Sequence, residues 1–301
     1  MQGHDIADAS PFPAGTSLQA LLAAGQPLVV PTVFNALSAQ VAQRAGFHAL
    51  YLGAGPLGYF HGGLEANIGL MEVAGDALRI RAVSPLPLLM DGVCGWGDPM
   101  HVQRTVAVAQ AAGFCAIELE DQWMPKRAHH HVRLEKMVPQ PLMEQKIAAA
   151  VAARRSPDFL VIGRTNAVRT TGIDDCVRRL EAYHRRGADL LFCMPRTPEE
   201  AAFIGARLPP CLVCMPSEGG VESCVLPLAD LHALGFRLVL LANPVMAAMY
   251  KAMADSYGAL HAGRPLPVLA GTSVRAQLQE LNDCVGLQAM LALERATVGA
   301  T

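Results

Sequence analysis

The chain repeats one pattern along most of its length: a short run of apolar residues is followed by a longer stretch whose apolar residues have helical spacing. Within each short run the apolar residues are consecutive, which is typical of parallel strands buried on both faces. Eight such strands alternating with helices predict an α/β fold, a closed (β/α)8 barrel or TIM barrel. The predicted strands are residues 28–33, 48–53, 86–91, 115–120, 159–164, 189–194, 211–215 and 237–242.

Helix boundaries are marked independently of the apolar pattern. A capping side chain before a proline predicts three helix starts, and a glycine that can take the left-handed conformation predicts three helix ends. A G-x-G-x-x-G turn after the first strand, typical of an open dinucleotide-binding sheet, is absent. The predicted starts are Pro99, Pro198 and Pro244, and the glycines are Gly46, Gly113 and Gly187.

The length of 301 residues lies within the range of one such barrel. Hydrophobic residues make up 52% of the chain, enough for a large core. We expect a single barrel domain over residues 1–301, with residues 1–15 as a loose N-terminal arm and residues 258–301 as a C-terminal helical tail. One amphipathic helix is predicted in the tail, over residues 274–294. Because the ring of barrel helices has no place for it, this helix should cover another surface, in the same chain or on another subunit.

Charge and cysteine usage narrow the class of protein. The formal net charge is −2, so no basic excess is available for nucleic acid or an anionic membrane surface. No long apolar stretch predicts a transmembrane helix, and the N-terminal residues do not resemble a secretory signal. The eight cysteines lie mostly in apolar runs, as is usual in a reducing compartment. We expect a cytoplasmic protein with no nucleic-acid and no membrane partner.

Carboxylates lie in the last residues of two neighbouring predicted strands. The carboxyl ends of the strands form the side of such a barrel that carries the active site. Glu118 and Glu120 alternate, so both point to one side of their strand, and Asp91 ends the adjacent strand. Three carboxylates at one cavity repel each other unless they share a cation or one is protonated. Oxygen ligands of this kind suit Mg²⁺ or Mn²⁺.

Simpler interpretations remain open for these charges. Glu120 and Asp121 can pair with Lys126 and Arg127 at the barrel rim. Arg164 ends an otherwise apolar strand, where an unpaired charge would be costly, so it needs an anionic partner. We favour a ligand over a protein carboxylate as that partner.

Two motifs around these residues are specific in sequence and spacing: residues 117–127, IELEDQWMPKR, and residues 163–167, GRTNA. They resemble the isocitrate lyase and phosphoenolpyruvate mutase superfamily, and the resemblance extends from about residue 28 to the tail. The other matching segments are residues 34–39, 51–55, 91–97, 134–139, 146–150 and 187–189.

The resemblance implies a barrel whose last helix is exchanged between subunits, usually in a dimer of dimers, so we expect a homo-oligomer. It implies a small 2-oxo or 2-hydroxy carboxylate as substrate. It also implies a lyase that makes or breaks a C–C bond through a metal-stabilised enolate.

The resemblance assigns roles to individual residues. It implies that Asp91 holds Mg²⁺ (or Mn²⁺), that Glu120 acts on the metal through water, and that Arg164 and backbone amides hold the enolate oxygens. Glu118 is then an extra ligand or a base, and Lys126 or a histidine of the following loop carries a proton. The catalytic candidates are Glu118, Lys126, His129 and Arg164. The substrate-binding candidates are Tyr51, Gly53, Ala54, Gly55, Asn67, Trp96, Arg164 and Asn166.

The chain departs from the superfamily pattern at several positions. Val93 stands where a second aspartate of the metal motif is expected, which should weaken metal binding. Met194 replaces an acidic residue after the sixth strand. Ala128 replaces the cysteine that protonates the departing carbon, unless a neighbouring histidine takes over.

Three functions therefore remain open. The first is a C–C lyase, and the second is an oxaloacetate decarboxylase or an enzyme with phosphonopyruvate hydrolase or mutase-like C–P chemistry. A mutase is disfavoured because Asn67 aligns with the acidic nucleophile, although Glu65 could approach the same space. The third is a ligand-binding protein that has lost turnover.

Overall fold

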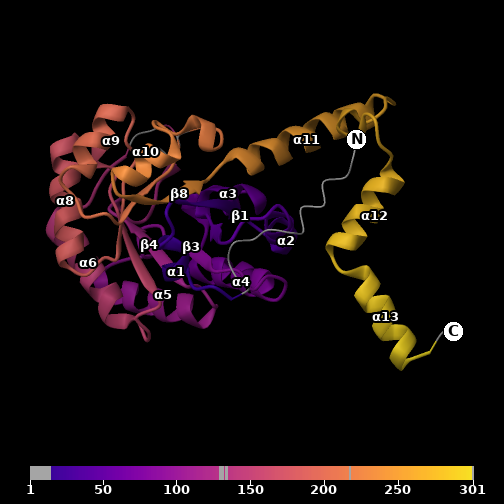
Figure 1. The fold of residues 1–301 in the computed structure, drawn as a ribbon, viewed down its shortest axis with the longest axis horizontal. Helices are drawn as coiled ribbons and strands as arrows, with labels where there is room; N and C mark the ends of the chain where they lie inside the picture. The colour runs from indigo at the N-terminus through magenta and orange to yellow at the C-terminus, as the bar shows by residue number, and fades with distance from the viewer. Residues whose placement is uncertain (1–14, 129–131, 133–134, 217, 300–301) are drawn as a thin grey trace. The chain divides into compact units, whose positions relative to one another are not determined.

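The computed structural model describes residues 15–299 except 129–131, 133–134 and 217. Its centre is a closed barrel of eight parallel strands in chain order, with β8 paired to β1 (Figure 1). The predicted (β/α)8 barrel is confirmed. The strands are β1 (Leu28–Val33), β2 (Leu50–Leu52), β3 (Leu88–Asp91), β4 (Ala116–Glu120), β5 (Leu160–Arg164), β6 (Leu190–Phe192), β7 (Leu212–Cys214) and β8 (Phe236–Leu241).

Most of these strands are shorter than the apolar runs that predicted them. Residues 189–194, for example, contain only the three residues of β6. Ala49 and Cys193 flank β2 and β6 and are fully buried without belonging to either strand. A run of apolar residues indicates which residues are buried, whereas a strand includes only residues that form hydrogen bonds with a neighbouring strand. The ends of the apolar runs therefore differ from the ends of the strands.

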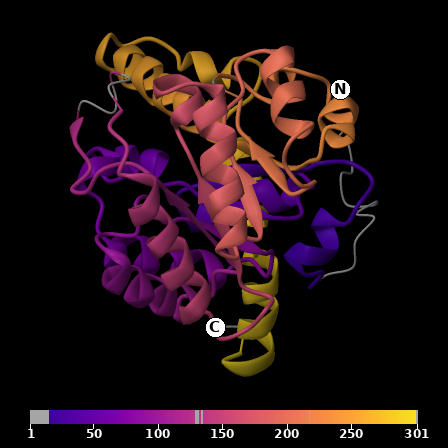
Figure 2. The same cartoon turned by 90° about the vertical axis from the view of Figure 1, so that its left-hand side faces the viewer.

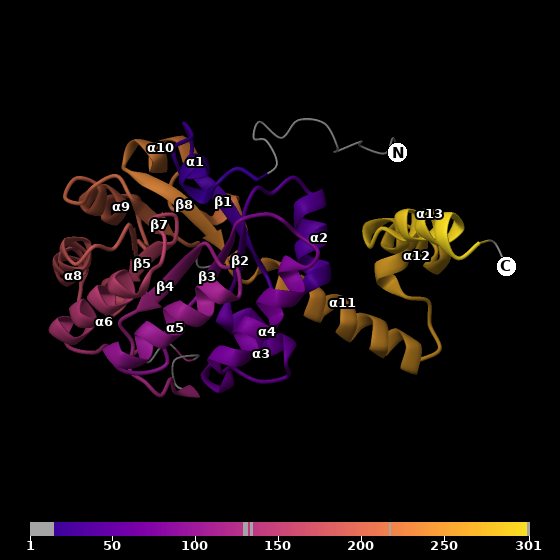
Figure 3. The same cartoon turned by 90° about the horizontal axis from the view of Figure 1, so that it is seen from below.

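Helices surround the strands, and Figure 3 shows α4, α5, α6, α8 and α9 outside the barrel. Seen from the left of Figure 1, α6 and α8 lie in front of the strands (Figure 2). The helix starts predicted at Pro99 and Pro198 are confirmed. The helices of this unit are α1 (Leu18–Leu22), α2 (Ala36–Arg44), α3 (Ala54–Phe60), α4 (Leu70–Arg81), α5 (Pro99–Ala111), α6 (Gln140–Ala153), α7 (Ala167–Thr170), α8 (Ile173–Arg185), α9 (Pro198–Gly205) and α10 (Leu228–Ala233), with 3₁₀ turns η1 (Glu65–Asn67) and η3 (Val221–Ser223).

The predicted glycine turns are also confirmed. Gly46, Gly113 and Gly187 have φ of 92°, 85° and 94°, in the left-handed region that a side chain disfavours. Each of them leads from the end of a helix towards the next strand, after α2, α5 and α8 respectively.

The interior of the barrel is filled by side chains of its strands, and this cluster includes Val30, Leu89, Ile162, Val213 and Leu238. The barrel is therefore a packed core rather than a channel. Function must lie at the strand ends, where the polar residues are.

Residues 244–301 form a second compact unit. It contains α11 (Pro244–His261), the 3₁₀ turn η4 (Pro267–Leu269), α12 (Val274–Cys284) and α13 (Leu287–Thr297). The helix start predicted at Pro244 is confirmed, and the expected tail boundary, Gly258, lies inside α11. The single helix predicted over residues 274–294 is wrong: Gly286, with φ of 82° in the left-handed region, separates α12 from α13.

No helix in the described ranges combines the length and apolarity needed to cross a membrane. All eight cysteines are free thiols.

Candidate active site

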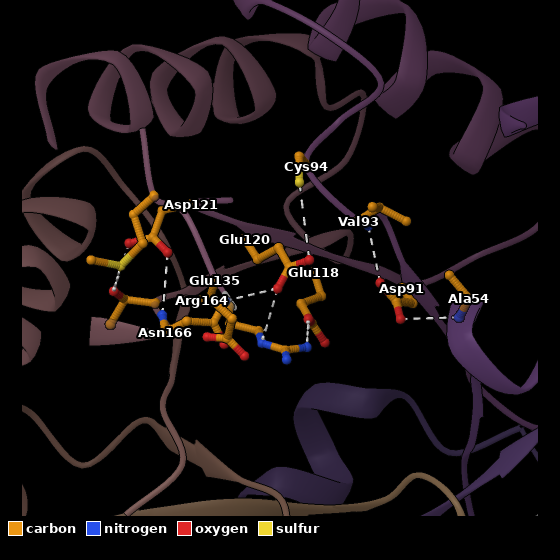
Figure 4. A network of polar contacts seen from close by, with 12 residues as sticks. Ala54, Asp91, Val93, Cys94, Glu118, Glu120, Asp121, Glu135, Arg164 and Asn166 are labelled. Carbon is orange, nitrogen blue, oxygen red and sulfur yellow. Dashed lines mark hydrogen bonds and ion pairs between the residues drawn. The ribbon is translucent and has the colours of Figure 1, made fainter. Parts of the chain in front are cut away.

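Strand register brings the predicted charged residues together at one end of the barrel. Asp91 of β3 pairs with Glu118 of β4, and Glu120 of β4 pairs with Arg164 of β5. Glu118 and Glu120 are two residues apart, so their side chains point to the same side of β4. All four side chains are buried, and Figure 4 shows them in one cluster. This cluster lies at the carboxyl ends of the strands, the active-site end of such barrels.

Glu118 is fully buried and accepts two hydrogen bonds. Tyr51 Oη donates to its Oε2 at 2.7 Å, and Arg164 Nη1 donates to its Oε1 at 2.7 Å. Burial raises the pKa of Glu118 to about 7, although Arg164 favours the charged form. Burial also raises the pKa of Tyr51, so its hydroxyl keeps the proton that it donates. Glu118 is therefore a carboxyl group able to exchange a proton near neutrality.

Arg164 lies against two protein carboxylates. Besides its bond to Glu118, its Nε lies 3.5 Å from Glu120 Oε2, and its guanidinium carbon lies 4.7 Å from the centre of the Phe192 ring. The sequence favours a ligand as the anionic partner of Arg164, but the structure provides protein partners, because the β4–β5 register places Glu120 opposite Arg164. A ligand would thus meet a guanidinium whose position is already fixed.

Glu120 has a second cationic partner, Lys126, whose Nζ pairs with Glu120 Oε1 and with Glu65 Oε1. Burial by itself lowers the pKa of Lys126, but the two carboxylates outweigh burial and hold the pKa well above its usual value. Burial raises the pKa of Glu65 to about 7 despite Lys126. The Glu120–Lys126 pair considered from the sequence is confirmed. In this arrangement Lys126 is a fixed positive charge.

Asp121 holds the ends of β4 and β5 together beneath the cluster. The alternative pairing of Asp121 with Arg127 at the rim is wrong, because the side chain of Asp121 is fully buried and its cationic partner is Arg179, at 3.2 Å. Asn166 N donates to Asp121 Oδ1 at 3.2 Å, and Asn166 Nδ2 donates to Glu120 Oε2 at 2.9 Å. Asp121 therefore positions the side chain of Asn166. The side chain of Asp121 also accepts hydrogen bonds from Thr165 Oγ1 at 2.6 Å and Tyr183 Oη at 2.9 Å.

Backbone amides from the segments after β2 and after β3 hold the carboxylate of Asp91. Ala54 N donates to Oδ2 and Val93 N donates to Oδ1, each at 3.0 Å. Gly92 has no room for a side chain, because a Cβ there would lie 2.4 Å from the carbonyl oxygen of Glu118. Val93 has φ of 50°, which is disfavoured for a β-branched residue. The carboxylate of Asp91 is therefore held in one orientation.

Trp96 lies in the loop after β3. Its ring packs against the cluster of Ala54, Val93 and Cys94, and its Nε1 donates to the carbonyl oxygen of Ile68 at 3.0 Å. Ile68 directly follows η1, which carries Glu65. Trp96 thus ties the loop after β3 to the turn that carries Glu65.

The structure places Glu65, rather than Asn67, in the cluster. Glu65 is buried, whereas Asn67 is exposed and its Oδ1 accepts from Leu64 N at 3.4 Å. The 3₁₀ turn directs these neighbouring side chains differently, which alignment alone does not reveal. A carboxylate therefore occupies the space in which we expected an amide.

Three predicted residues remain: Gly53, Gly55 and His129. Gly53 and Gly55 lie at the start of α3, where a Cβ on Gly53 would approach Thr32 Cγ2 to 3.1 Å, and one on Gly55 would approach Glu65 Oε2 to 3.9 Å. His129 lies outside the described residues. The predicted residues that meet at the cluster are Tyr51, Ala54, Asp91, Glu118, Glu120, Lys126, Arg164 and Asn166.

The donor chemistry of the cluster fits Mg²⁺, which prefers oxygen and usually takes one or two carboxylates while keeping several waters. No three His, Cys, Asp or Glu side chains in the described part of the chain are placed to hold one metal ion. Val93 supplies no ligand. Asp91 and Glu120 are the carboxylates that would hold such an ion, with water as its other ligands, and Glu120 is already paired with Lys126.

The chain is similar to a known protein family and to individual enzymes. Residues 18–261 match the family model of phosphoenolpyruvate phosphomutase. The 2,3-dimethylmalate lyase of Eubacterium barkeri is 33% identical over 281 residues, which cover 92% of this chain and 96% of that enzyme.

Two solved structures are similar over almost the whole chain. Oxaloacetate acetylhydrolase in complex with the inhibitor 3,3-difluorooxalacetate has a TM-score of 0.83 and 30% identity, with 96% of this chain and 98% of that chain covered. Phosphonopyruvate hydrolase in complex with oxalate and Mg²⁺ has a TM-score of 0.80 and 27% identity, with 95% and 100% covered.

Proposed function

The chain belongs to the phosphoenolpyruvate phosphomutase family, as its motifs predict, and from this premise we propose that it is a carbon–carbon lyase. Its substrate would be a small 2-oxo or 2-hydroxy dicarboxylate, cleaved through an enolate. The observation that carries the proposal is the buried cluster in which Glu118, Glu120 and Arg164 meet at the barrel mouth. The relative with 33% identity, a 2,3-dimethylmalate lyase, supports a substrate of this class.

Cleavage of a hydroxy acid begins with a base that removes the proton of the hydroxyl group. Glu118 suits this step, because its pKa of about 7 leaves a large share of the carboxyl group ionised at neutral pH. The new carbonyl forms as the C–C bond breaks, and the electron pair of that bond moves onto the carbon beside a carboxylate. An enolate results, which must then take up a proton.

The enolate oxygens need fixed positive charge in a site with little water. Arg164 provides a guanidinium held by Glu118 and stacked on Phe192, and Lys126 provides an ammonium. When held by Asp91 and Glu120, Mg²⁺ would supply a Lewis acid for the same negative charge.

Ala128 has no proton to give to the enolate carbon, so another group must deliver it. Glu65 is a candidate besides His129, since it lies against Lys126 inside the cluster. Tyr51 keeps Glu118 oriented through its hydroxyl, and Asn166 does the same for Glu120.

Product analysis tests the proposal. We expect purified protein with Mg²⁺ to convert 2,3-dimethylmalate or 2-methylisocitrate into a 2-oxo acid and a second carboxylate, identified by proton NMR. Glu118→Gln should lower kcat/KM by about 100-fold or more, as expected for loss of a general base. Glu144→Gln changes the same residue type on α6, where Glu144 pairs with Arg186, and should leave kcat/KM unchanged.

Other substrates separate the alternatives. Release of pyruvate and carbon dioxide from oxaloacetate would indicate a decarboxylase, and release of phosphate from phosphonopyruvate would indicate C–P cleavage, for which Glu65 restores a carboxylate at the site. Tight binding of these acids without conversion of any would overturn the proposed lyase and indicate a binding protein.

We also propose a homo-oligomer, a dimer of dimers in which the C-terminal helices are exchanged between subunits. Apolar residues of α12 and α13 support this, since Leu278 and Leu293 are 52% and 64% exposed in the single chain. Free thiols at all eight cysteines are consistent with a cytoplasmic location.

A further inference from the structure

We propose that a cavity beside the active site binds a second anionic group of the substrate, carried on an apolar chain, and that Arg169 and Arg196 select it. The inference rests on the proposed function, because the reacting end of the same substrate would lie at Arg164. It specifies the substrate as a dicarboxylate whose second carboxylate is separated from the 2-oxo or 2-hydroxy group by a run of carbon atoms.

The cavity has a volume of about 200 Å³, far more than the roughly 10–15 Å³ that one water needs. It lies at the carboxyl ends of β6 and β7 and among the loops that follow them. Among the described residues that line it, the two charged ones are Arg169 and Arg196, and none is acidic. The main apolar lining residues are Met194, Pro195, Met215, Pro216 and Val225. This lining suits a chain of carbon atoms that ends in an anion.

The cavity is linked to the charged cluster through one residue. Arg169 Nη2 donates to Asn166 Oδ1 at 3.2 Å, and Asn166 Nδ2 donates to Glu120 Oε2 at 2.9 Å. Arg169 lies on α7, just after the strand that carries Arg164. Met194 lies two residues after Phe192, on which Arg164 is stacked. We therefore place the two ends of one substrate at Arg164 and in the cavity.

Both guanidinium groups are held in place by carboxylates outside the cavity lining. Arg169 Nη2 donates to Glu135 Oε1 at 2.7 Å. Arg196 Nε donates to Glu200 Oε1 at 3.0 Å, and its Nη2 donates to the same oxygen at 2.5 Å. Within the described ranges these side-chain bonds of Arg196 use Nε and Nη2, which leaves Nη1 for a ligand. A guanidinium carries five N–H donors, so the carboxylate of Glu200 does not use all the donors of Arg196.

Binding measurements with matched acids test the inference. The probes are 2-oxoadipate, which has two carboxylates, and 2-oxohexanoate, which has the same chain and one carboxylate. By calorimetry we expect 2-oxoadipate to bind about tenfold more tightly, the effect of one charge-assisted contact. Arg196→Gln should remove most of this preference and leave the affinity for 2-oxohexanoate unchanged. Arg207→Gln, on an arginine that stacks on Phe203, is the matched control and should keep the preference.

A second variant strengthens the test. Glu200→Gln removes the carboxylate that neutralises Arg196, so the affinity for 2-oxoadipate should rise several-fold. Equal affinity of the native protein for both probes, or a preference that survives in Arg196→Gln, would overturn the inference. Turnover of short dicarboxylates in that case would leave the proposed function standing. Absence of binding by any 2-oxo acid would overturn both.

Discussion

Lys126 neutralises Glu120, which we propose as a ligand of a divalent cation. Its Nζ pairs with Glu120 and Glu65, so two carboxylates already have a cation without any metal. Binding of the proposed Mg²⁺ would therefore compete with this ion pair for Glu120.

This competition gives the first prediction. Lys126→Met should increase the affinity for Mg²⁺ by about tenfold, because it leaves the carboxylates without a cationic partner. Titration calorimetry of the metal-free protein measures the effect. Lys136→Met removes an exposed lysine near Trp123 and should not change the affinity. Weaker or unchanged binding by Lys126→Met would contradict the assignment of Glu120 to the metal.

Val93 gives the second prediction at the scale of single residues. Its φ of 50° suits aspartate better than valine, and its amide already bonds Asp91. Val93→Asp adds a buried carboxylate, which should lower the melting temperature without metal. Added Mg²⁺ should then raise the melting temperature more in this variant than in the native protein. Calorimetry or fluorescence measures both melting temperatures. An equal rise of the melting temperature in the two proteins would argue against an ion next to Asp91.

At the scale of elements, α8 supports the site through its first turns. Asp175 bonds Arg179 Nε at 3.0 Å, and Arg179 Nη1 reaches Asp121 at 3.2 Å beneath the ends of β4 and β5. Burial opposes ionisation of Asp175, but hydrogen bonds from Thr171, Arg178 and Arg179 outweigh it and lower its pKa to about 2. The first turns of α8 thus help to position Asp121.

This lowered pKa gives the third prediction. Because the pKa of Asp175 is lower in the folded state than in the unfolded chain, its contribution to stability is present above pH 4 and is lost as pH falls through about 2. Asp175→Asn should lower the free energy of unfolding by about 1 kcal/mol or less at pH 7. The difference from the native protein should shrink between pH 4 and pH 2, as measured by urea unfolding. A difference that stays constant over this range would contradict the assigned role.

Element boundaries were predictable where a residue type controls the backbone. Pro99 and Pro198 begin helices, and Gly46 and Gly113 end them, because proline and glycine act through their own φ angles. The break at Gly286 is not visible in the sequence because apolar residues with helical spacing occur on both sides of this glycine. One glycine inside an amphipathic pattern does not by itself predict a helix end.

At the scale of the whole molecule, the exposed apolar residues of α12 and α13 require an explanation. No residue of either helix is buried in the single chain. Exchange of these helices between subunits would remove their apolar side chains from water, at about 25 cal/mol for each Å² buried.

This gives the fourth prediction. The native protein should have the mass of a dimer or tetramer in light scattering, and the double variant Leu278→Asp, Leu293→Asp should shift the mass towards the monomer. Glu280→Lys, a charge change on α12, is the control and should leave the mass unchanged. A native protein with the mass of one chain would overturn the proposed exchange.

The sequence by itself determined the barrel, the order of its strands and the end at which the charged residues lie. Consecutive apolar residues encode burial on both faces, and the parity of Glu118 and Glu120 fixes their common side, so both are properties of short segments. The tertiary structure alone decided which charges neutralise each other. Lys126 bonds Glu65, which lies 61 positions away, and Arg179 bonds Asp121, 58 positions away. Such pairs form only where segments after different strands bring their side chains within a few ångströms of each other. The pattern of residues within one short segment does not predict the distance between side chains of different segments.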